Sequence, residues 1–355
     1  MKSFPLFASL LVLAGCNVAV NDGKQEEATS TQRVAIPDTS LTFEDVRDTG
    51  APQPPRPILK AQVALDRLGF SPGVIDGKEG QSYHLALRGF QEANDLPVTG
   101  RLDQATAQAL GRQAVPETRL VRIPAAFAQG PFVPDLPKEA AAQAKLPALG
   151  YRTLTEALAE RFHTTPEMLV ALNPPDTKIG AGAVIRVPNT AEAPVPSGPD
   201  DRGWNRTLQM LGVSADQPAA AKVVVDKSDG VLRAFDDAGK LIAQFPATMG
   251  SSHDPLPIGT WKIEGISRNP DFHYNPKLFW DVSDNKKAVT LKPGPNGPVG
   301  VVWLDLSKPH YGIHGTSEPQ TIGRAESHGC VRLTNWDAAK LAGMVKPGTP
   351  AIFQE

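Results

Sequence analysis

Hydrophobic residues recur at helical spacing in the first third of the chain. In ILKAQVALDRLGF, residues 58–70, Leu59 and Val63 are four positions apart and share one helical face. A glycine-rich turn, SPGVIDGKEG, separates this helix from a second one predicted in HLALRGFQEANDL. A third helix is predicted after Asp103, whose carboxylate suits an N-cap. Residues 57–112 are therefore expected to form a small three-helix domain.

The segment 146–190 combines helical and strand patterns. In LGYRTLTEALAERFHTTPEMLVALNPPDTKIGAGAVIRVPN, Leu158, Phe162 and Leu169 are apolar positions of two predicted helices. The opening residues and AVIRVP favour strands. The order strand, helix, helix, strand predicts a small α/β module.

Apolar and polar residues alternate from about Ala221 onward, which indicates β-strands. KVVVDKSDGVLRAF predicts two strands around a turn at Asp229 and Gly230, and KLIAQFPATMG continues the meander. TWKIEGI and VGVVWLDL add strands between proline-rich loops at 251–257 and 268–298, and NWDAAKLAGMV predicts a helix before the last strand, TPAIFQE. Residues 221–355 are expected to form a mainly β domain, a sandwich or a barrel-like fold.

The remaining segments lack a periodic pattern. Residues 16–56 are polar and end in APQPPRP, which favours an extended tether. Residues 113–145 are rich in proline and alanine and are predicted to be a linker, as are residues 191–220. With 34 prolines in 355 residues, the chain is expected to contain several small domains joined by linkers.

The N-terminus has the pattern of an export signal. MKSFPLFASLLVLAGC contains Lys2, an apolar run from Phe4 to Ala14, and small residues before Cys16. The apolar run is shorter than the roughly 20 residues of a membrane-spanning helix. The last four residues of MKSFPLFASLLVLAGC, LAGC, resemble a bacterial lipobox. This resemblance implies removal of residues 1–15 and acylation of the Cys16 thiol. The mature protein is then expected to be lipid-anchored in the cell envelope and periplasmic, and Asn17 favours the outer membrane of a diderm host.

The charge balance makes one class of partner improbable. The chain has 36 Lys and Arg against 38 Asp and Glu, and it contains no basic tract interleaved with aromatic residues. Nucleic acid is therefore not an expected partner.

Cys330 lies in SHGCVRL, residues 327–333, and is a candidate nucleophile. The chain has two cysteines, so a lipid on Cys16 would leave Cys330 without an intramolecular disulfide partner. An inert buried cysteine behaves as a small hydrophobe. Polar, flexible and charged neighbours surround this one instead: Ser327, His328, Gly329 and Arg332.

A cysteine of ordinary pKa, about 8.5, is mostly protonated at neutral pH and needs a base. His314, in YGIHGT, lies sixteen positions upstream, which leaves room for a strand, a turn and a return strand to bring both side chains to one cleft. A backbone carbonyl near Gly315 or Thr316 is expected to orient the imidazole. Backbone N–H groups beside Gly329 suit a developing oxyanion, and Arg332 suits thiolate stabilisation or a substrate carboxylate.

The segments HGT at 314–316 and SHGCVRL at 327–333, with Gly323 between them, resemble the L,D-transpeptidase catalytic domain of the YkuD type over residues 221–355. MGSSHDPLPIGTWKI, residues 249–263, is similar to the strand and proline-rich loop of that family. The resemblance implies that Cys330 is the nucleophile and His314 the general base, while the neighbouring residues of SHGCVRL shape the site.

The same resemblance implies a substrate and a reaction. Cys330 would attack the carbonyl after the L-centre of meso-diaminopimelate in a tetrapeptide stem and expel D-alanine. An amine of another stem would take the thioester and give a 3→3 cross-link; a protein amine or water are the other acceptors. Peptidoglycan is thus the expected partner, and no cofactor or metal is expected.

Two N-terminal segments resemble wall-binding modules. IDG at 75–77, FQ at 90–91 and TGRLDQAT at 99–106 resemble the peptidoglycan-binding domain type 1. Residues 146–190 resemble a LysM module in the order of their elements, in Asn173 and in GAVIRVPN. A small α/β spacer without sugar affinity is the alternative interpretation of this second segment.

Three alternatives to a transpeptidase stay open. A hydrolase or L,D-carboxypeptidase would share the nucleophile and use water, and a wall-binding scaffold would have lost activity. A zinc site would use His310, His314, His328 and Cys330, but their one-cysteine spacing fits no standard pattern. His253 and His273, in the long loops, are interpreted as ordinary exposed histidines or as lining of a substrate groove.

Overall fold

The structure is a computed structural model that describes residues 40–51, 53–191, 194, 201–278, 282, 285–327 and 329–355. The predicted signal peptide, Cys16 and His328 lie outside the described residues. A search of the described part of the chain finds no helix with the length and apolar character needed to cross a bilayer.

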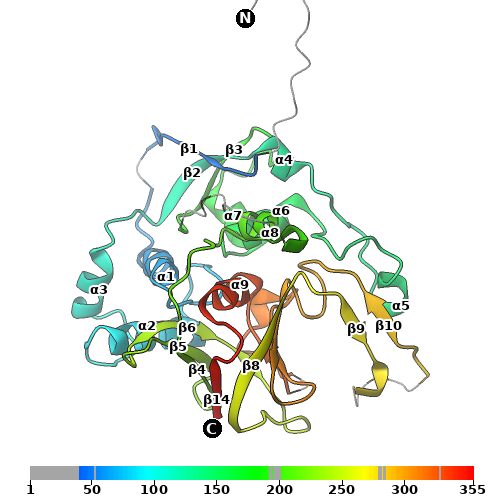
Figure 1. Cartoon of the computed structure of the whole chain (residues 1–355). Coiled ribbons are helices and arrows are strands. Elements are labelled where there is room, and N and C mark those ends of the chain that lie inside the picture. Colours follow the sequence, from blue (N-terminus) through cyan, green and yellow to red (C-terminus); the bar gives the residue numbers. More distant parts are fainter. Residues whose placement is uncertain are drawn as a thin grey trace, which may run out of the picture. The chain divides into compact units, whose positions relative to one another are not determined.

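Three helices form the domain predicted at 57–112: α1 (Pro57–Arg67), α2 (Gln81–Ala93) and α3 (Gln104–Gly111) (Figure 1). The carboxylate of Asp103 accepts a hydrogen bond from the backbone N–H of Thr106, so the expected N-cap of α3 is confirmed. Helix α2 begins at Gln81, earlier than the sequence pattern suggested. Leu65, Leu87 and Phe90 are buried together between these helices.

A small antiparallel sheet has the strand order β1-β2-β3, with β1 (Glu44–Val46), β2 (Thr118–Arg122) and β3 (Val184–Pro188). It shares a core with α6 (Leu154–Arg161) and α7 (Pro166–Leu172). The opening strand expected near residue 149 is not formed, because β2 takes the place beside β3.

Parts of the predicted tether and linkers are thus ordered. Phe43 packs edge-to-face on Phe127 and Phe162, with ring centroids 5.0 and 5.1 Å apart, and this burial holds β1 on the sheet. The predicted linker 113–145 contains β2, α4 (Ala125–Ala128) and α5 (Ala140–Gln143). In 191–220, η1 (Asp201–Gly203) precedes α8 (Trp204–Leu211), which buries Trp204 and Leu211 in the C-terminal core.

The C-terminal part is mainly β, as predicted. In the described chain, one nine-stranded sheet has the order β6-β5-β4-β14-β8-β11-β12-β13-β7. Its strands are β4 (Lys222–Asp226), β5 (Val231–Phe235), β6 (Leu241–Pro246), β7 (Thr248–Met249), β8 (Gly259–Arg268), β11 (Val302–Leu306), β12 (Gly312–His314), β13 (Val331–Arg332) and β14 (Pro350–Gln354). Strand β8 joins the two halves, since it pairs first with β14 and then with β11.

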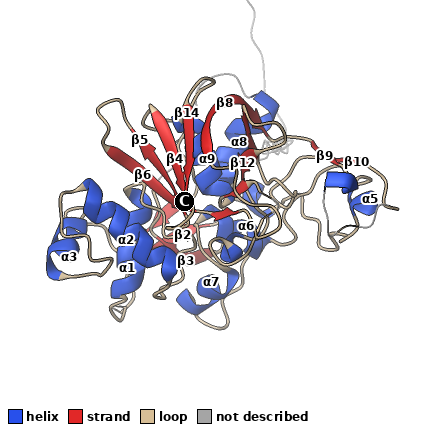
Figure 2. Ribbon diagram, turned by 90° about the horizontal axis from the view of Figure 1, so that it is seen from below, coloured by secondary structure: helices blue, strands red, loops and turns tan. Residues whose placement is uncertain are grey.

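Helix α9 (Asn335–Met344) lies against this sheet, and its buried residues share one core with strands of both halves (Figure 2). Thr334 caps the helix through its hydroxyl, which accepts from the N–H of Asp337. The proline-rich segment 268–298 contains a separate hairpin of β9 (Phe272–Tyr274) and β10 (Val289–Leu291), with η2 (Pro276–Leu278) following β9.

The helical domain packs on the edge strand β6. Gln244 accepts from the N–H of Ser71 at 2.8 Å and donates its own N–H to Gly69 O at 3.0 Å. Its side-chain amide donates to Leu85 O of α2 at 2.7 Å. These bonds cover a sheet edge that would otherwise expose unpaired backbone groups. Residues Asp38–Glu355 form one compact unit, so the domains are docked on one another rather than separated by free linkers.

A buried polar cluster joins three parts of the chain. Asp66 of α1 lies 2.7 Å from Nζ of Lys340 on α9 and 3.0 Å from Nδ1 of His163, which follows α6. The His163 ring stacks on Trp336 with centroids 5.1 Å apart. The cationic Lys340 and the contacts with His163 keep the pKa of Asp66 well below its usual range, even though burial acts to raise it.

Candidate active site

Two short parallel strands bring His314 and Cys330 together. In the pairing of β12 with β13, Ile313 lies opposite Val331 and His314 lies opposite Arg332. Ile313 and Val331 are fully buried, so side chains of the alternate residues point to the other face. Cys330 directly precedes β13 and takes a hydrogen bond from the backbone of Gly312, two residues before His314.

The return strand was expected to follow a turn, and the structure differs on this point. Because β12 and β13 are parallel, the chain must cross over between them, and residues 315–330 make this crossover with η3 (Pro319–Thr321) in its course. The parallel pairing brings the strand that ends at His314 beside the strand that follows Cys330.

His314 is held in one tautomer. Its Nδ1 lies 2.7 Å from the carbonyl oxygen of Gly315, which can only accept, so Nδ1 carries the proton and Nε2 is left with its lone pair. Burial lowers the pKa of His314 to about 4, and the positive charge of Arg332 acts in the same direction. At neutral pH the imidazole is therefore a neutral base with a fixed orientation.

Trp303 on β11 supports this imidazole from the neighbouring strand. It lies opposite His314 in the antiparallel pairing, and the two rings stack with centroids 5.5 Å apart at 22°. A Cβ on Gly312 would approach the Trp303 ring to 2.4 Å, so the indole also covers Gly312. The glycine at 312 thus lets the indole lie flat against β12.

The Cys330 thiol is half-buried and free of disulfide bonding. Its Sγ lies 3.9 Å from the carbonyl oxygen of His310. Burial raises the pKa of Cys330, while a backbone hydrogen bond from Gly312 and the charge of Arg332 oppose this rise. Cys330 in the resting site is therefore a neutral thiol.

Arg332 is bonded to the backbone of the loop that precedes Cys330. Its Nη1 donates to Glu326 O at 3.3 Å, and its pKa is lowered by burial but raised by the charges of Cys330 and Glu318. The guanidinium is the positive charge that acts on both His314 and Cys330.

Ser327 and Gly329 shape the loop before Cys330. The Ser327 hydroxyl donates to Cys330 O at 2.6 Å and accepts from the N–H of Gly250 at 2.7 Å, and Ser327 is buried. Gly329 has φ of +91°, and a Cβ there would lie 2.6 Å from the Tyr311 ring. Ser327 thus fixes the Cys330 backbone, and the space beside Gly329 is occupied by Tyr311.

Gly315 and Thr316 follow His314 and are both buried. The Thr316 hydroxyl accepts from the N–H of Glu318 at 3.2 Å and turns the chain away from β12. A Cβ on Gly315 would lie 2.2 Å from Oδ1 of Asn335, so the first residue of α9 is packed directly on the peptide that holds His314.

A cleft of about 420 Å³ lies beside the crossover loop. Its walls come from α6, α7 and residues 317–320, and Glu318 lines it. The residues that line the cleft do not include Cys330, His314 or Arg332, although the charge of Glu318 acts on Arg332.

The two histidines of the long loops, His253 and His273, lie at exposed positions. His253 is exposed, with Nδ1 3.3 Å from Asp254, and His273 is exposed, with Nδ1 3.1 Å from Thr290 Oγ1. Within the described residues, no three His, Cys, Asp or Glu side chains gather in a way that could hold a metal ion.

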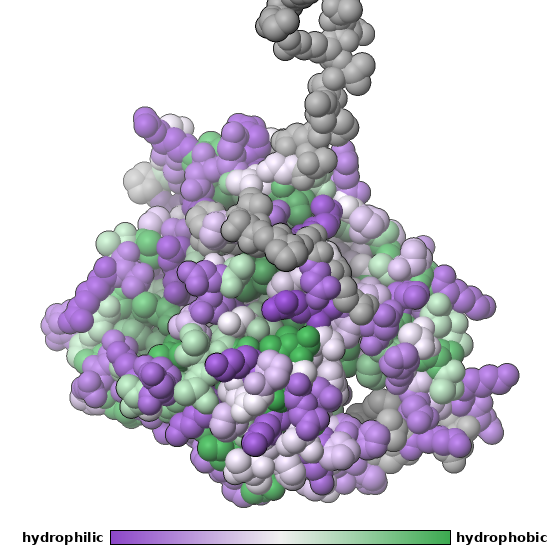
Figure 3. Space-filling view, viewed as in Figure 1, coloured by the Kyte–Doolittle hydropathy of each residue, from purple (hydrophilic) through white to green (hydrophobic). Residues whose placement is uncertain are grey.

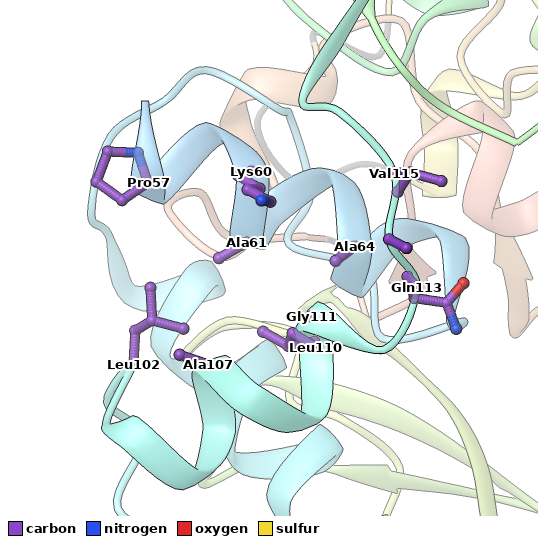
Figure 4. A pocket seen from close by; sticks show the side chains of 11 residues that line it. Pro57, Lys60, Ala61, Ala64, Leu102, Ala107, Leu110, Gly111, Gln113 and Val115 are labelled. Carbon is purple, nitrogen blue, oxygen red and sulfur yellow. The ribbon is translucent and has the colours of Figure 1, made fainter. Parts of the chain in front are cut away.

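A second hollow, of about 220 Å³, lies in the helical domain between α1 and α3 (Figure 4). Ala61 and Ala64 of α1 face Ala107 and Leu110 of α3 across it, and Leu102 closes one side. Hydrophobic side chains show over these helices on the face seen in Figure 3. This hollow is the candidate ligand site of the N-terminal domain.

Comparison with known proteins agrees with these features. Residues 220–353 match the family model of the L,D-transpeptidase catalytic domain, YkuD. Residues 56–110 match the "Putative peptidoglycan binding domain". The resemblances inferred from SHGCVRL and from TGRLDQAT are confirmed, whereas the LysM-like character of 146–190 stays a prediction.

Two curated relatives and one solved structure are similar to parts of the chain. A Bacillus licheniformis protein named "Putative L,D-transpeptidase YkuD" is 28% identical over 196 residues, which cover 55% of this chain and 89% of the relative. Its Bacillus subtilis namesake is 56% identical over 61 residues, 17% of this chain and 37% of that protein. A solved L,D-transpeptidase of Mycobacterium smegmatis is 22% identical with a TM-score of 0.31, covering 38% of this chain and 58% of its own.

Sequence reasoning missed the residues that support His314 from a distance. Trp303 was contained in the predicted strand VGVVWLDL, and Asn335 begins the predicted helix, but neither lies in a local motif with His314. The alternation of side chains along a strand would have placed Trp303 on one face of VGVVWLDL. The register that sets it opposite His314 comes only from the folded sheet.

Proposed function

We propose that the chain is a peptidoglycan L,D-transpeptidase in which Cys330 is the nucleophile and His314 the general base. The observation that supports this proposal is the pairing of β12 with β13, which brings the strand ending at His314, a neutral imidazole of fixed tautomer, beside the strand that follows Cys330. The match of residues 220–353 to a family of cysteine-nucleophile acyltransferases supports it.

The proposed reaction begins with proton transfer. Nε2 of His314 takes the Cys330 proton as the sulfur attacks the stem carbonyl after the L-centre of diaminopimelate. The tetrahedral oxyanion then collapses, the bond to D-alanine breaks, and the imidazolium gives its proton to the leaving amine. An acceptor amine attacks the thioester, His314 takes the proton from that amine, and the released sulfur regains a proton as the 3→3 bond forms.

The low pKa of His314 suits a base that is charged only during the reaction. A buried imidazole that gained a proton at rest would compete poorly for the thiol proton. Gly329, Ser327, His328, Arg332, Gly315 and Thr316 are proposed to position the thiol, the imidazole and the substrate.

Peptidoglycan is the proposed partner of both ends of the chain. A domain at 56–110 that binds the polymer would raise the local concentration of stems at Cys330. The cleft of about 420 Å³ beside Glu318 offers room for part of a stem. The 146–190 module is proposed to assist as a LysM-like element.

Residues 1–16 are proposed to direct export and lipidation on Cys16, which would keep the enzyme in the envelope. Cys16→Ala should shift the protein from the membrane fraction to the soluble periplasmic fraction. Continued membrane association of this variant, with no acyl chain found on the wild-type N-terminal peptide, would refute the anchor.

Product analysis tests the proposed function. Disaccharide-tetrapeptide is incubated with the chain, with Cys330→Ala and with His314→Gln, and the muropeptides are identified by mass spectrometry. A 3→3 dimer formed only by the unaltered chain is expected. Tripeptide alone, dependent on Cys330, would move the assignment to a hydrolase, and absence of any product would favour a scaffold.

A further inference from the structure

Glu160, a residue of the 146–190 module, forms a hydrogen bond with the C-terminal domain. Glu160, near the end of α6, is buried, and its Oε1 accepts from Nδ2 of Asn335 at 3.0 Å. Its Oε2 lies 2.7 Å from the Tyr151 hydroxyl. Glu160 is therefore held from both sides, by its own module and by the first residue of α9.

Asn335 transmits this contact to the active-site loops. Its Nδ2 also donates to Pro295 O at 3.1 Å, and its Oδ1 accepts from the N–H of Val301 at 3.3 Å. The carbonyl of Pro295 and the N–H of Val301 fix which end of the amide is oxygen. Oδ1 then fills the space at Gly300 and Gly315, where a Cβ would approach it to 1.9 and 2.2 Å.

The Gly315 peptide is the one that holds the imidazole. Its carbonyl accepts the Nδ1–H of His314 at 2.7 Å, and that bond exposes Nε2 as the basic atom. A shift of Asn335 would move the Gly315 carbonyl, and with it the imidazole.

We propose that Glu160 is a positioning residue for His314, acting through Asn335 and the Gly315 carbonyl, so that the 146–190 module completes the active site. The inference rests on the proposed function, in which His314 is the base. It assigns the module a task in the reaction that does not depend on binding of glycan.

The hydrogen bonds are compatible with either protonation state of Glu160. Burial raises the pKa of Glu160 to about 8. As an acid, Glu160 accepts from Asn335 through one oxygen and donates to the Tyr151 oxygen through the other. As a carboxylate, it accepts from both. Glutamine has the same length and can accept from Asn335 while donating to Tyr151, whereas methionine fills the space without either bond.

Glu160→Met and Glu160→Gln therefore form a matched pair, tested in the full chain. Asp176→Met, at an exposed position of the same module that does not line the cleft beside Glu318, is the control. We measure kcat and KM with disaccharide-tetrapeptide, and the tautomer of His314 from imidazole ¹⁵N shifts in histidine-labelled protein, assigned with His314→Gln. Circular dichroism verifies folding, and Tyr151→Phe, which loosens Glu160 without removing it, replaces Glu160→Met if that variant does not fold.

Glu160→Met is expected to lower kcat by roughly tenfold or more with little change in KM, since small displacements of catalytic groups are costly. Its His314 signal should change from a single Nδ1–H tautomer to a mixture. Glu160→Gln and Asp176→Met should retain wild-type kcat and the single tautomer. Tyr151→Phe should lower kcat and mix the tautomers in the same direction as Glu160→Met.

Two results would overturn the proposal: a wild-type kcat and tautomer in Glu160→Met or its substitute, or equal losses in Glu160→Gln and Glu160→Met. If the wild-type chain makes no product, the proposed function fails, and the tautomer comparison still decides whether Glu160 positions His314.

Discussion

Cys330 and His314 are both uncharged at rest, and this decides how the thiol should react. Burial raises the pKa of Cys330 above its ordinary value, and burial lowers that of His314 to about 4. A thiolate–imidazolium pair would instead show the opposite shifts. The thiol is therefore expected to be activated only when a substrate draws its proton toward Nε2.

Alkylation of Cys330 by iodoacetamide tests this resting state, in a chain whose Cys16 is replaced by serine. The rate should be lower than that of a free cysteine at pH 7 and should rise continuously with pH through 9, because only the thiolate reacts. Arg332→Gln should slow alkylation further at pH 7, since the arginine charge lowers the pKa of Cys330. A plateau of high reactivity between pH 5 and 6 would instead indicate a preformed ion pair.

Gly329 should be intolerant of a side chain for two separable reasons. Its φ of +91° is unfavourable for other residues, and a Cβ would lie 2.6 Å from Tyr311. Gly348 has a similar φ of +94° with no atom within 4 Å of the Cβ position, so it isolates the first reason. Gly329→Ala should lower the free energy of unfolding by about 2 kcal/mol and Gly348→Ala by about 1 kcal/mol, measured in urea. Equal losses would mean that the Tyr311 contact has no cost.

The sequence predicted those individual residues whose role depends on their immediate neighbours in the chain. Cys330 and His314 stand out because of their neighbours, and Asp103 because of its place before a helix. Trp303, Glu160 and Asn335 could not be predicted, since their relation to His314 comes from strand register and from docking across more than a hundred residues.

Among the elements, α9 is the one that joins the domains. Lys340 of α9 lies 2.7 Å from Asp66 of α1, and Asp337 accepts from the Ser71 hydroxyl at 2.7 Å. Both carboxylates are buried. Their ion pair and hydrogen bond are therefore needed to offset the free-energy cost of removing them from water.

Lys340→Met removes the positive charge and preserves much of the side-chain volume. The variant should lose about 3 kcal/mol in the free energy of unfolding at pH 7, because Asp66 would stay buried with fewer compensating partners. Lys346→Met, at an exposed position just after α9, should change the free energy by less than about 0.5 kcal/mol. The account of α9 would be contradicted by equal stabilities of the two variants in urea denaturation.

Elements with long periodic patterns were predictable, and short ones were not. The spacing of apolar residues defined α1, α9 and the hairpin of β4 with β5. Strand β1 has three residues and β2 has five, so their structure depends on pairing with β3 rather than on their own composition. Strands β1 and β2 and helix α8 lie in proline-rich segments, which the sequence analysis interpreted as a tether and linkers.

For the molecule as a whole, the contacts between domains mean that the N-terminal domains should not unfold independently of the C-terminal domain. Composition favoured modules on free linkers, but Gln244, Asp66 and Asn335 each bind a residue of another module. The compact unit Asp38–Glu355 should thus unfold cooperatively.

Calorimetry of the chain should show one transition. A fragment of residues 220–355 should melt roughly 10 °C lower or fail to fold, because a loss of 1 kcal/mol moves the melting temperature by about 4–8 °C in domains of about 60–100 residues and by about 2–4 °C in domains of about 150–250 residues. Two transitions in the chain, one of them at the melting temperature of the isolated fragment, would show that the domains are independent.

The central claim is that Cys330 forms a thioester with a stem peptide while His314 accepts its proton. Intact-protein and peptide mass spectrometry of the chain, quenched during turnover of disaccharide-tetrapeptide, tests it most directly. The account predicts an adduct equal to the substrate less D-alanine, located on Cys330, absent in Cys330→Ala and strongly reduced in His314→Gln. Cross-linked or trimmed product from a chain in which Cys330 is never acylated, or full activity of Cys330→Ala, would contradict it.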